Sequence, residues 1–306
     1  MADVLHGNCA VTIVSNGYEP ASQCDPMTLT WTVVAAVLVG ALLHASWNAM
    51  VKSSSDKAMD TALLQLMGSI VAIPLVLMLG LPDRAAWPYI AASLVVHIGY
   101  YTTLSGAYKH GDLGLTYPLM RGSAPLLVAL SASVTLGETL SPLAWVGVLG
   151  ISAGVLTLGL SQHAFAAPKA VRFALFNAVI IAVYTVVDAL GVRAGGNAMQ
   201  YVTALFLLDG WPFALIVFAR RRGAVLPYAR KRWPVALVGA IASMGSYAIA
   251  LWAMTQAPVA TVAALRETSV LFAVLLGVWF LKEVFTPRRL IGTCAIVGGV
   301  VALRLG

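Results

Sequence analysis

The chain has 306 residues, of which 60% are hydrophobic and only 10% are charged, with a net charge of +7 and a mean hydropathy of +0.87. Soluble domains carry about 25% charged residues, so this composition excludes a large solvent-facing domain and predicts a polytopic membrane protein. The basic residues lie between apolar segments, where membrane topology explains them, and we therefore predict no nucleic-acid partner.

The chain begins with a polar stretch. Residues 1–26 contain no Lys or Arg and no long apolar core, which argues against a secretory signal. We predict that residues 1–27 form a mobile N-terminal tail, with Met27 as an alternative start. The three cysteines form no CxxC or Cys/His cluster, so we predict no metal site and no cofactor.

Ten apolar segments follow, each close to the 20 or so residues that a helix needs to cross the hydrocarbon of a bilayer. They are 28–51, 61–80, 87–106, 113–133, 141–161, 171–191, 199–219, 233–254, 257–281 and 288–304. The predicted fold class is therefore all-α, a polytopic membrane protein with ten transmembrane helices.

The first span carries polar side chains in the stretch LLHASWNAMVK. His44 and Asn48 are four residues apart and share one helix face, beside Trp47. Inside a membrane such groups must be satisfied or used. The face either lines a cavity or lets Asn48 bond to a neighbouring helix, and for Asn48 alone the second alternative is favoured.

Further polar and aromatic groups fall in the third, sixth and eighth spans. Tyr101 and Tyr247 lie deep enough in their spans to stack on a substrate or bond to it. Tyr184 and Asp188 form a second i, i+4 pair, on the equivalent of the first helix. His97 is a candidate for carrying a coupling proton, because imidazole exchanges protons near neutral pH, although a lone histidine is more often structural.

The spans repeat. A shift of 145 residues relates Arg121 to Arg266 (266 − 121 = 145), and the same shift relates Glu138 to Glu283, Pro142 to Pro287, Gly147 to Gly292 and Gly154 to Gly299. Five spans per copy is an odd number, so the second copy enters from the opposite side. We predict two inverted repeats of five helices, 28–165 and 166–306, an architecture of many secondary transporters.

The two related arginines are the strongest candidates for a site. Together they would hold a carboxylate or phosphonate across a cavity. In the structural alternative they neutralise Asp188, Asp209 and Glu267, and both alternatives stay open. Adjacent helical residues point about 100° apart, so Glu267 is predicted to face another helix than Arg266 does. The prolines around Arg121 predict a kink there.

Loop charges predict the topology. Fourteen basic residues follow odd-numbered spans and three follow even-numbered ones, which places the former side in the cytoplasm and both termini outside. The fourteen are Lys52, Lys57, Lys109, Lys169, Arg172, Arg220, Arg221, Arg222, Arg230, Lys231, Arg232, Lys282, Arg288 and Arg289, and the three are Arg84, Arg193 and Arg304.

Ten spans, a duplicated five-helix unit, a Glu at the turn before the last helix of each unit, and the opening LLHASWNAMVK together resemble the drug/metabolite transporter superfamily, in its EamA-type branch. The resemblance covers residues 28–304. It implies export of amino acids or other small metabolites. Relatives are often drawn with their termini inside, whereas the loop charges here predict the opposite.

We therefore expect a secondary transporter in the inner membrane that exports small metabolites such as amino acids by alternating access. The alternatives are an organophosphate or phosphonate transporter or exchanger, and an intramembrane enzyme or lipid-handling protein. No GxxxxGK[ST] motif is present, and no enzyme is predicted; Glu138 and Glu283 are interpreted as N-terminal caps of the last helix of each unit. The substrate-binding candidates are Arg121, Arg266, Tyr101, Tyr247, His44, Asn48, Trp47 and Tyr184, and the coupling candidates are His97, Asp188 and Glu267.

Overall fold

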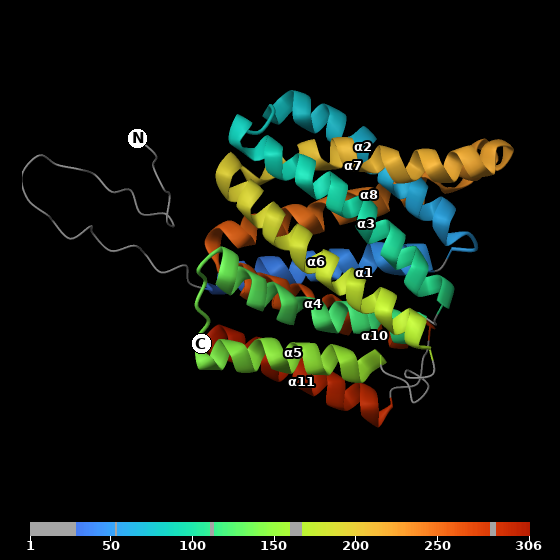
Figure 1. The fold of residues 1–306 in the computed structure, drawn as a ribbon. Coiled ribbons are helices and arrows are strands. Elements are labelled where there is room, and N and C mark those ends of the chain that lie inside the picture. The colour runs from blue at the N-terminus through green and yellow to red at the C-terminus, as the bar shows by residue number, and fades with distance from the viewer. Residues whose placement is uncertain (1–28, 53, 111–112, 160–166, 282–285) are drawn as a thin grey trace, which may run out of the picture.

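A computed structural model describes residues 29–52, 54–110, 113–159, 167–281 and 286–306. The predicted tail 1–27 lies outside these residues. All the regular secondary structure within them is helical, with no strand among the described residues. The helices form a bundle whose long members run roughly side by side (Figure 1).

The helices follow the predicted spans in order. Each predicted span overlaps a helix, and two shorter helices, α9 and α10, occupy the ninth span. The elements are α1 (Trp31–Lys52), α2 (Lys57–Leu79), η1 (Arg84–Ala86), α3 (Trp87–His110), α4 (Leu113–Thr135), α5 (Pro142–Gly159), α6 (Pro168–Gly195), α7 (Ala198–Arg221), η3 (Arg222–Ala224), α8 (Val225–Gln256), α9 (Val259–Arg266), α10 (Ser269–Leu281) and α11 (Pro287–Leu305).

Four helical segments within the described residues are long and apolar enough to cross a membrane by length and composition alone. They are Trp31–Val51, Lys57–Leu79, Pro168–Gly195 and Ala198–Gln256, the last of which includes both α7 and α8. These segments fit a polytopic membrane protein. The count of ten membrane crossings stays a prediction.

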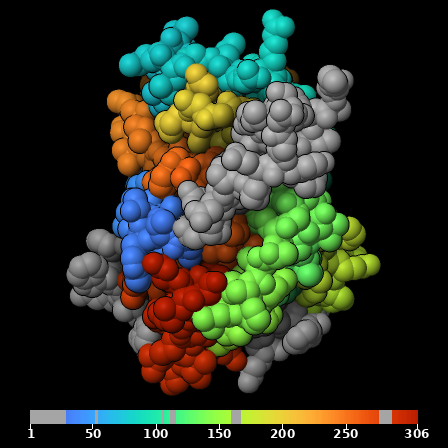
Figure 2. All heavy atoms as spheres, turned by 90° about the vertical axis from the view of Figure 1, so that its left-hand side faces the viewer, coloured from blue at the N-terminus to red at the C-terminus, as the bar shows by residue number. Residues whose placement is uncertain are grey.

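The two halves of the chain interleave. The first helix of each half packs on the third helix of the other: α1 on α8, and α6 on α3. It also packs on the fourth span of the other half: α1 on α9 and α10, and α6 on α4. α2 packs on α7, and α5 packs on α11. Each of these contacts has a counterpart when α1–α5 are exchanged for α6–α11. In Figure 2 the blue surface of α1 correspondingly lies between orange and red residues of the second half.

The tightest of these contacts joins α5 and α11, side by side at the bottom of Figure 1. A Cβ on Gly147 would lie 2.8 Å from the Gly299 carbonyl oxygen, and a Cβ on Gly154 would lie 2.7 Å from the Gly292 oxygen. The helices are antiparallel, because the earlier glycine of one meets the later glycine of the other. The 145-residue shift converts one contact into the other, as exchange of two inverted units requires.

A break in the helical backbone lies in the second half. The kink predicted around Arg121 falls in α4, which the structure keeps as one helix through Pro118 and Pro125. The equivalent segment of the second half divides into α9 and α10 at Glu267 and Thr268, whose amides bond to the carbonyls of Ala264 and Leu265 at 3.0 and 3.1 Å. These bonds span three residues and tighten the end of α9.

Candidate functional site

Arg121 and Glu267 form an ion pair between the two halves. The Arg121 Nε lies 2.9 Å from the Glu267 Oε2, and their side chains are only 9% and 5% exposed. The Nε–H does not point at that oxygen, so the contact is an ion pair without a well-directed hydrogen bond. Glu267 thus faces a different helix from Arg266, as predicted, and the structure gives Arg121 a carboxylate partner of its own.

Arg266 has a different environment. Its guanidinium lies over the Tyr247 ring, 5.4 Å from the ring centroid, which is cation–π geometry. The side chain is half-buried, and the described residues include no ion-pair partner for it. A cation held by an aromatic face keeps its N–H donors available for an anion.

Asp188 lies fully buried on α6 and is held by two tyrosines instead of by an arginine. The Tyr201 hydroxyl donates to Asp188 Oδ1 at 2.7 Å. The Tyr247 hydroxyl donates to Asp188 Oδ2. Tyr247 therefore bonds to Asp188 through its hydroxyl and carries Arg266 on its ring, so that one residue links a buried acid to the cation without an ion-pair partner.

An aromatic group lies between α3 and α6. The His97 and Tyr184 rings stack with centroids 4.7 Å apart, and Tyr100 meets Tyr184 edge to face at 6.0 Å. The His97 Nδ1 lies 2.8 Å from the Ser93 carbonyl oxygen. Tyr184 also packs in the same core cluster as Tyr247, so the aromatic group is continuous with the ring that carries Arg266.

Tyr101 forms a hydrogen bond to a second acid, Asp209. Its hydroxyl donates to Asp209 Oδ2 at 3.2 Å and accepts from the Gln65 amide. Its ring stacks on Phe213 with centroids 5.1 Å apart. Tyr101 thus joins α3 to α2 and α7, whereas Tyr247 joins α8 to α6.

On the polar face of α1, the Asn48 amide is satisfied within its own helix and the Trp47 indole is not. The Asn48 side chain donates to the His44 carbonyl oxygen at 2.8 Å, so the favoured bond to a neighbouring helix is wrong for this amide donor. The His44 and Trp47 rings meet edge to face at 5.2 Å. The Trp47 indole N–H is buried without an acceptor. A buried donor with no acceptor is costly, and a bound polar group would satisfy it.

The sequence did not point us to three polar residues that bond between helices: the buried Tyr201 and Asn177, and the half-buried Gln65. Asn177 donates to the Tyr100 carbonyl oxygen at 3.0 Å and to the Thr103 hydroxyl at 2.9 Å, which fixes α6 against α3. An amide in the middle of an apolar span was a usable signal for Asn177 and Gln65. The Tyr201 bond had none, because tyrosine near a span end is most often an interfacial anchor.

Glu138 does not cap the last helix of its own unit, and the prediction that it does is wrong. Its carboxylate accepts from the amide of Val259, the first residue of α9, at 2.8 and 3.1 Å, and pairs with Arg193 at 2.9 Å. Ser141 instead accepts from the Ala144 amide at the start of α5. Anions favour helix N-termini, and the fold brings a different helix to this one. Glu283 lies outside the described residues.

Among the described residues inside the predicted spans, the acids have partners, whereas Arg266 has no ion-pair partner. Glu267 pairs with Arg121, Asp188 and Asp209 accept from tyrosines, and Glu138 pairs with Arg193. Within the described part of the chain, no group of three or more His, Cys, Asp or Glu is arranged to hold a metal ion. The arrangement is suited to binding an anionic group at Arg266.

Comparison with known proteins relates the second half of the chain to a family of transporters. Residues 168–305 match the EamA-like transporter family. The chain carries an EamA-like domain of the drug/metabolite transporter superfamily. The EamA-like domain nearly coincides with the second predicted unit, 166–306, and it contains Asp188, Tyr247, Arg266 and Glu267.

The relatives cover almost the whole chain. PA1977, an uncharacterized protein of Pseudomonas aeruginosa, is 28% identical over 294 residues, which is 92% of this chain and 97% of that protein. A protein crystal structure with 21% identity superposes with a TM-score of 0.72, covering 90% of this chain and 96% of that one. The second likeness shows the fold alone.

The match of residues 168–305 to the EamA-like transporter family suggests a membrane transporter of the drug/metabolite type. The family and the long apolar helices together indicate a multi-pass membrane protein.

Proposed function

We propose that the protein is a secondary transporter of the inner membrane that exports a small metabolite bearing a carboxylate, such as an amino acid, by alternating access. Ten membrane-crossing segments in two inverted five-helix units, 28–165 and 166–306, would provide the two moving parts. The exchangeable helix contacts and the antiparallel glycine contacts of α5 and α11 support this arrangement. In such transporters the substrate binds at the interface between the repeats, often at a broken helix.

One observation carries the choice of substrate. Arg266 ends α9 at the helix break, lies over the Tyr247 ring, and has no ion-pair partner among the described residues. A guanidinium in such a place binds a carboxylate through two parallel hydrogen bonds. The neighbouring His97–Tyr184 stack offers aromatic faces for the remainder of the substrate.

The organophosphate alternative receives less support. It rested on two free guanidinium groups acting together, as a dianion requires, and Arg121 already neutralises Glu267 at 2.9 Å. We therefore assign Arg121 to the link between the halves and Arg266 to the substrate. A singly charged carboxylate matches one available arginine.

Asp188 is the preferred site for a coupling proton. It is fully buried and accepts from the Tyr247 hydroxyl, so its protonation would change the hydrogen bonding of the ring that supports Arg266. His97 lies farther along the same aromatic group, stacked on Tyr184. Glu267 is less suited to this role, because it neutralises a buried arginine.

The test is ligand-dependent thermal stabilisation of the purified protein against amino acids, phosphonates and sugar phosphates, followed by flux in proteoliposomes. A ligand that binds the folded state raises the melting temperature. Arg266→Lys keeps the charge and loses the planar fork. We expect it to weaken binding by about 10- to 150-fold, the equivalent of a charged hydrogen bond of about 1.5–3 kcal/mol.

Arg304→Lys is the matched control, because Arg304 also lies over an aromatic ring, that of Trp31, with 4.8 Å to the centroid. It should keep wild-type affinity. Unchanged affinity in Arg266→Lys would contradict the assignment of Arg266. Stabilisation by phosphonates alone would favour the organophosphate alternative.

Orientation is tested separately. The loop charges place the turn between α7 and α8 in the cytoplasm. A Leu226→Cys variant in a background without other cysteines should resist a membrane-impermeant thiol reagent in intact cells and react after permeabilisation. Ready labelling in intact cells would reverse the assigned orientation.

A further inference from the structure

α8 is too long for the membrane. It has 32 residues, which at 1.5 Å per residue is about 48 Å, whereas the hydrocarbon core is about 30 Å thick. Its C-terminal end is buried in the bundle at Ala253 and Met254. The surplus is therefore at the N-terminal end, residues 225–232, and Figure 1 shows the α7–α8 hairpin reaching beyond the neighbouring helices.

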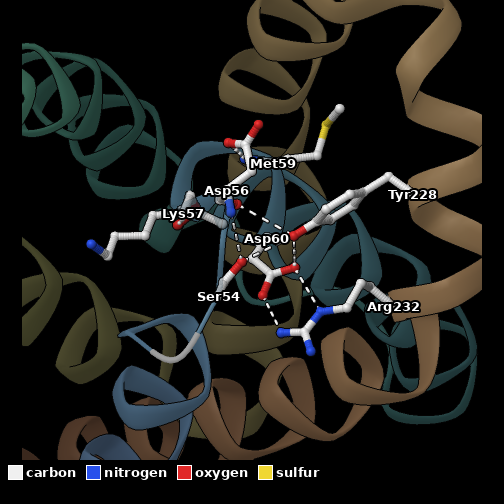
Figure 3. Close-up of polar contacts among 8 residues, drawn as sticks. Ser54, Asp56, Lys57, Met59, Asp60, Tyr228 and Arg232 are labelled. Carbon is white, nitrogen blue, oxygen red and sulfur yellow. Dashed lines mark hydrogen bonds and ion pairs between the residues drawn. The ribbon is translucent and has the colours of Figure 1, made fainter.

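One face of this surplus segment is fastened to the bundle. The Tyr228 hydroxyl donates to Asp60 Oδ1 at 2.7 Å and lies 3.0 Å from the Ser54 hydroxyl. The Arg232 Nε donates to Asp60 Oδ1 at 3.2 Å, and its terminal nitrogen bonds to the other oxygen. Figure 3 shows Tyr228 and Arg232 converging on Asp60 at the start of α2. These bonds hold residues 225–232 in place against the start of α2.

The opposite face is exposed and amphipathic. Leu226 is 61% exposed and Trp233 is 51% exposed, and Arg230 is exposed between them. Positions i, i+4 and i+7 lie within about 60° of one another on a helix. On the same scale Tyr228 and Arg232 point about 160° and about 120° away from Leu226, which explains why they reach Asp60 while the other three do not.

Cations surround this face. Exposed basic side chains on the hairpin are Arg220, Arg221, Arg222, Arg230 and Lys231. Among the described residues the ion pairs of these five comprise a single contact, Arg221 with Asp56 at 3.2 Å. A cluster of four or more such cations directly beside a membrane span binds acidic lipid surfaces.

We propose that the hairpin surface formed by Arg230 and Trp233, flanked by the exposed Arg220 and Lys231, binds the headgroup of an anionic phospholipid in the leaflet on its own side. The arginines contact the phosphate, and Trp233 lies at the level of the headgroups. A soluble polyanion would match the cations but leaves the exposed Trp233 without a role. The site is separate from Arg266 and does not depend on the transported substrate.

The experiment measures binding of a fluorescent short-chain phosphatidylglycerol to the full chain in neutral detergent, with phosphatidylcholine as the reference lipid. Each basic residue near a lipid surface contributes about a fivefold change in affinity. We expect the triple variant Arg220→Gln/Arg230→Gln/Lys231→Gln to bind phosphatidylglycerol roughly 100-fold more weakly, with an unchanged melting temperature. Trp233→Ala should weaken binding with all five cations retained.

The control removes the same number of exposed charges on the same predicted side, in Lys109→Gln/Lys169→Gln/Arg172→Gln. It should keep wild-type affinity for phosphatidylglycerol. Equal loss in the control would overturn the proposal, because net charge alone would then explain the binding. Equal binding of phosphatidylcholine, or equally strong displacement of the lipid by inorganic phosphate or an oligonucleotide, would also overturn it.

Discussion

Arg121 and Arg266 occupy equivalent positions in the two predicted units, and the structure gives them opposite environments. Arg121 lies within an unbroken α4, is 9% exposed and pairs with Glu267. Arg266 ends α9 beside a helix break and rests on the Tyr247 ring. The same residue type at equivalent positions therefore forms an ion pair between the halves in one case and, among the described residues, has no ion-pair partner in the other.

The difference has a simple physical origin. Glu267 directly follows Arg266, and its equivalent after Arg121 is Gly122. The two equivalent arginines therefore have one such carboxylate between them. Arg266 and Glu267 are adjacent in sequence, and adjacent residues on a helix do not face each other. Glu267 pairs with the arginine of the other half, and Arg266 has no ion-pair contact among the described residues. The arginine is present in both units, but the glutamate after it is present in the second unit alone, so the two arginines have different partners.

Removing Glu267 should have the largest effect, because it makes Arg121 resemble Arg266. In Glu267→Ala a buried guanidinium loses its carboxylate, and breaking a buried pair costs about 3–5 kcal/mol. The unfolding free energy should fall by that amount in a denaturant titration of the detergent-solubilised protein. The double variant Arg121→Leu/Glu267→Leu should recover most of it. If the unfolding free energy of Glu267→Ala fell by less than about 1 kcal/mol, Arg121 would not depend on Glu267 for its stability, and the proposed difference between the two arginines would be wrong.

Glu138 tests how the first half fixes the position of Arg266. Its carboxylate bonds to the Val259 amide at the start of α9, the helix that ends in Arg266. We expect Glu138→Ala to lower the unfolding free energy by about 1.5–3 kcal/mol, the range for charged hydrogen bonds, and to weaken ligand-dependent stabilisation. Glu138→Gln keeps an acceptor for Val259 and should retain part of both. Full ligand response in Glu138→Ala would show that α9 is held by other contacts.

The glycine contacts between α5 and α11 test a region in which the two halves have equivalent structures. A Cβ at Gly147 or at Gly292 would lie 2.8 or 2.9 Å from a carbonyl oxygen of the facing helix. Gly147→Ala and Gly292→Ala should each destabilise the protein, by about 1–3 kcal/mol for overpacking. Gly298→Ala is the control, because a Cβ there meets nothing within 4 Å. Markedly unequal effects of the first two variants would count against a symmetric contact between α5 and α11.

Substitution of the Tyr247 hydroxyl should have the smallest effect. Two different variants at this position separate the role of the hydroxyl from that of the ring. Tyr247→Phe keeps the ring under Arg266 and removes one donor to Asp188, which retains the bond from Tyr201. A loss of about 0.5–1.5 kcal/mol is expected for one hydrogen bond, with substrate affinity nearly unchanged. Tyr247→Leu removes the ring as well and should weaken binding. Equal affinities of the Phe and Leu variants would exclude the ring as the support of Arg266.

The sequence by itself determined the helical class, the order of the helices and the candidate polar residues. Apolar runs of about 20 residues leave the backbone no other way to satisfy its hydrogen bonds in a membrane. Charges within such runs stand out for the same reason, because burying them is costly. Arg121, Arg266, Asp188 and Glu267 were therefore visible before any fold was known.

The partners of these charges were decided only by the tertiary structure. Asp188 accepts from Tyr201 and Tyr247 instead of from an arginine, and Glu138 bonds to Val259, 121 residues later. Local sequence fixes which face of a helix a side chain occupies, but not which helix arrives opposite that face. Which cation remains without a counter-ion follows from that packing.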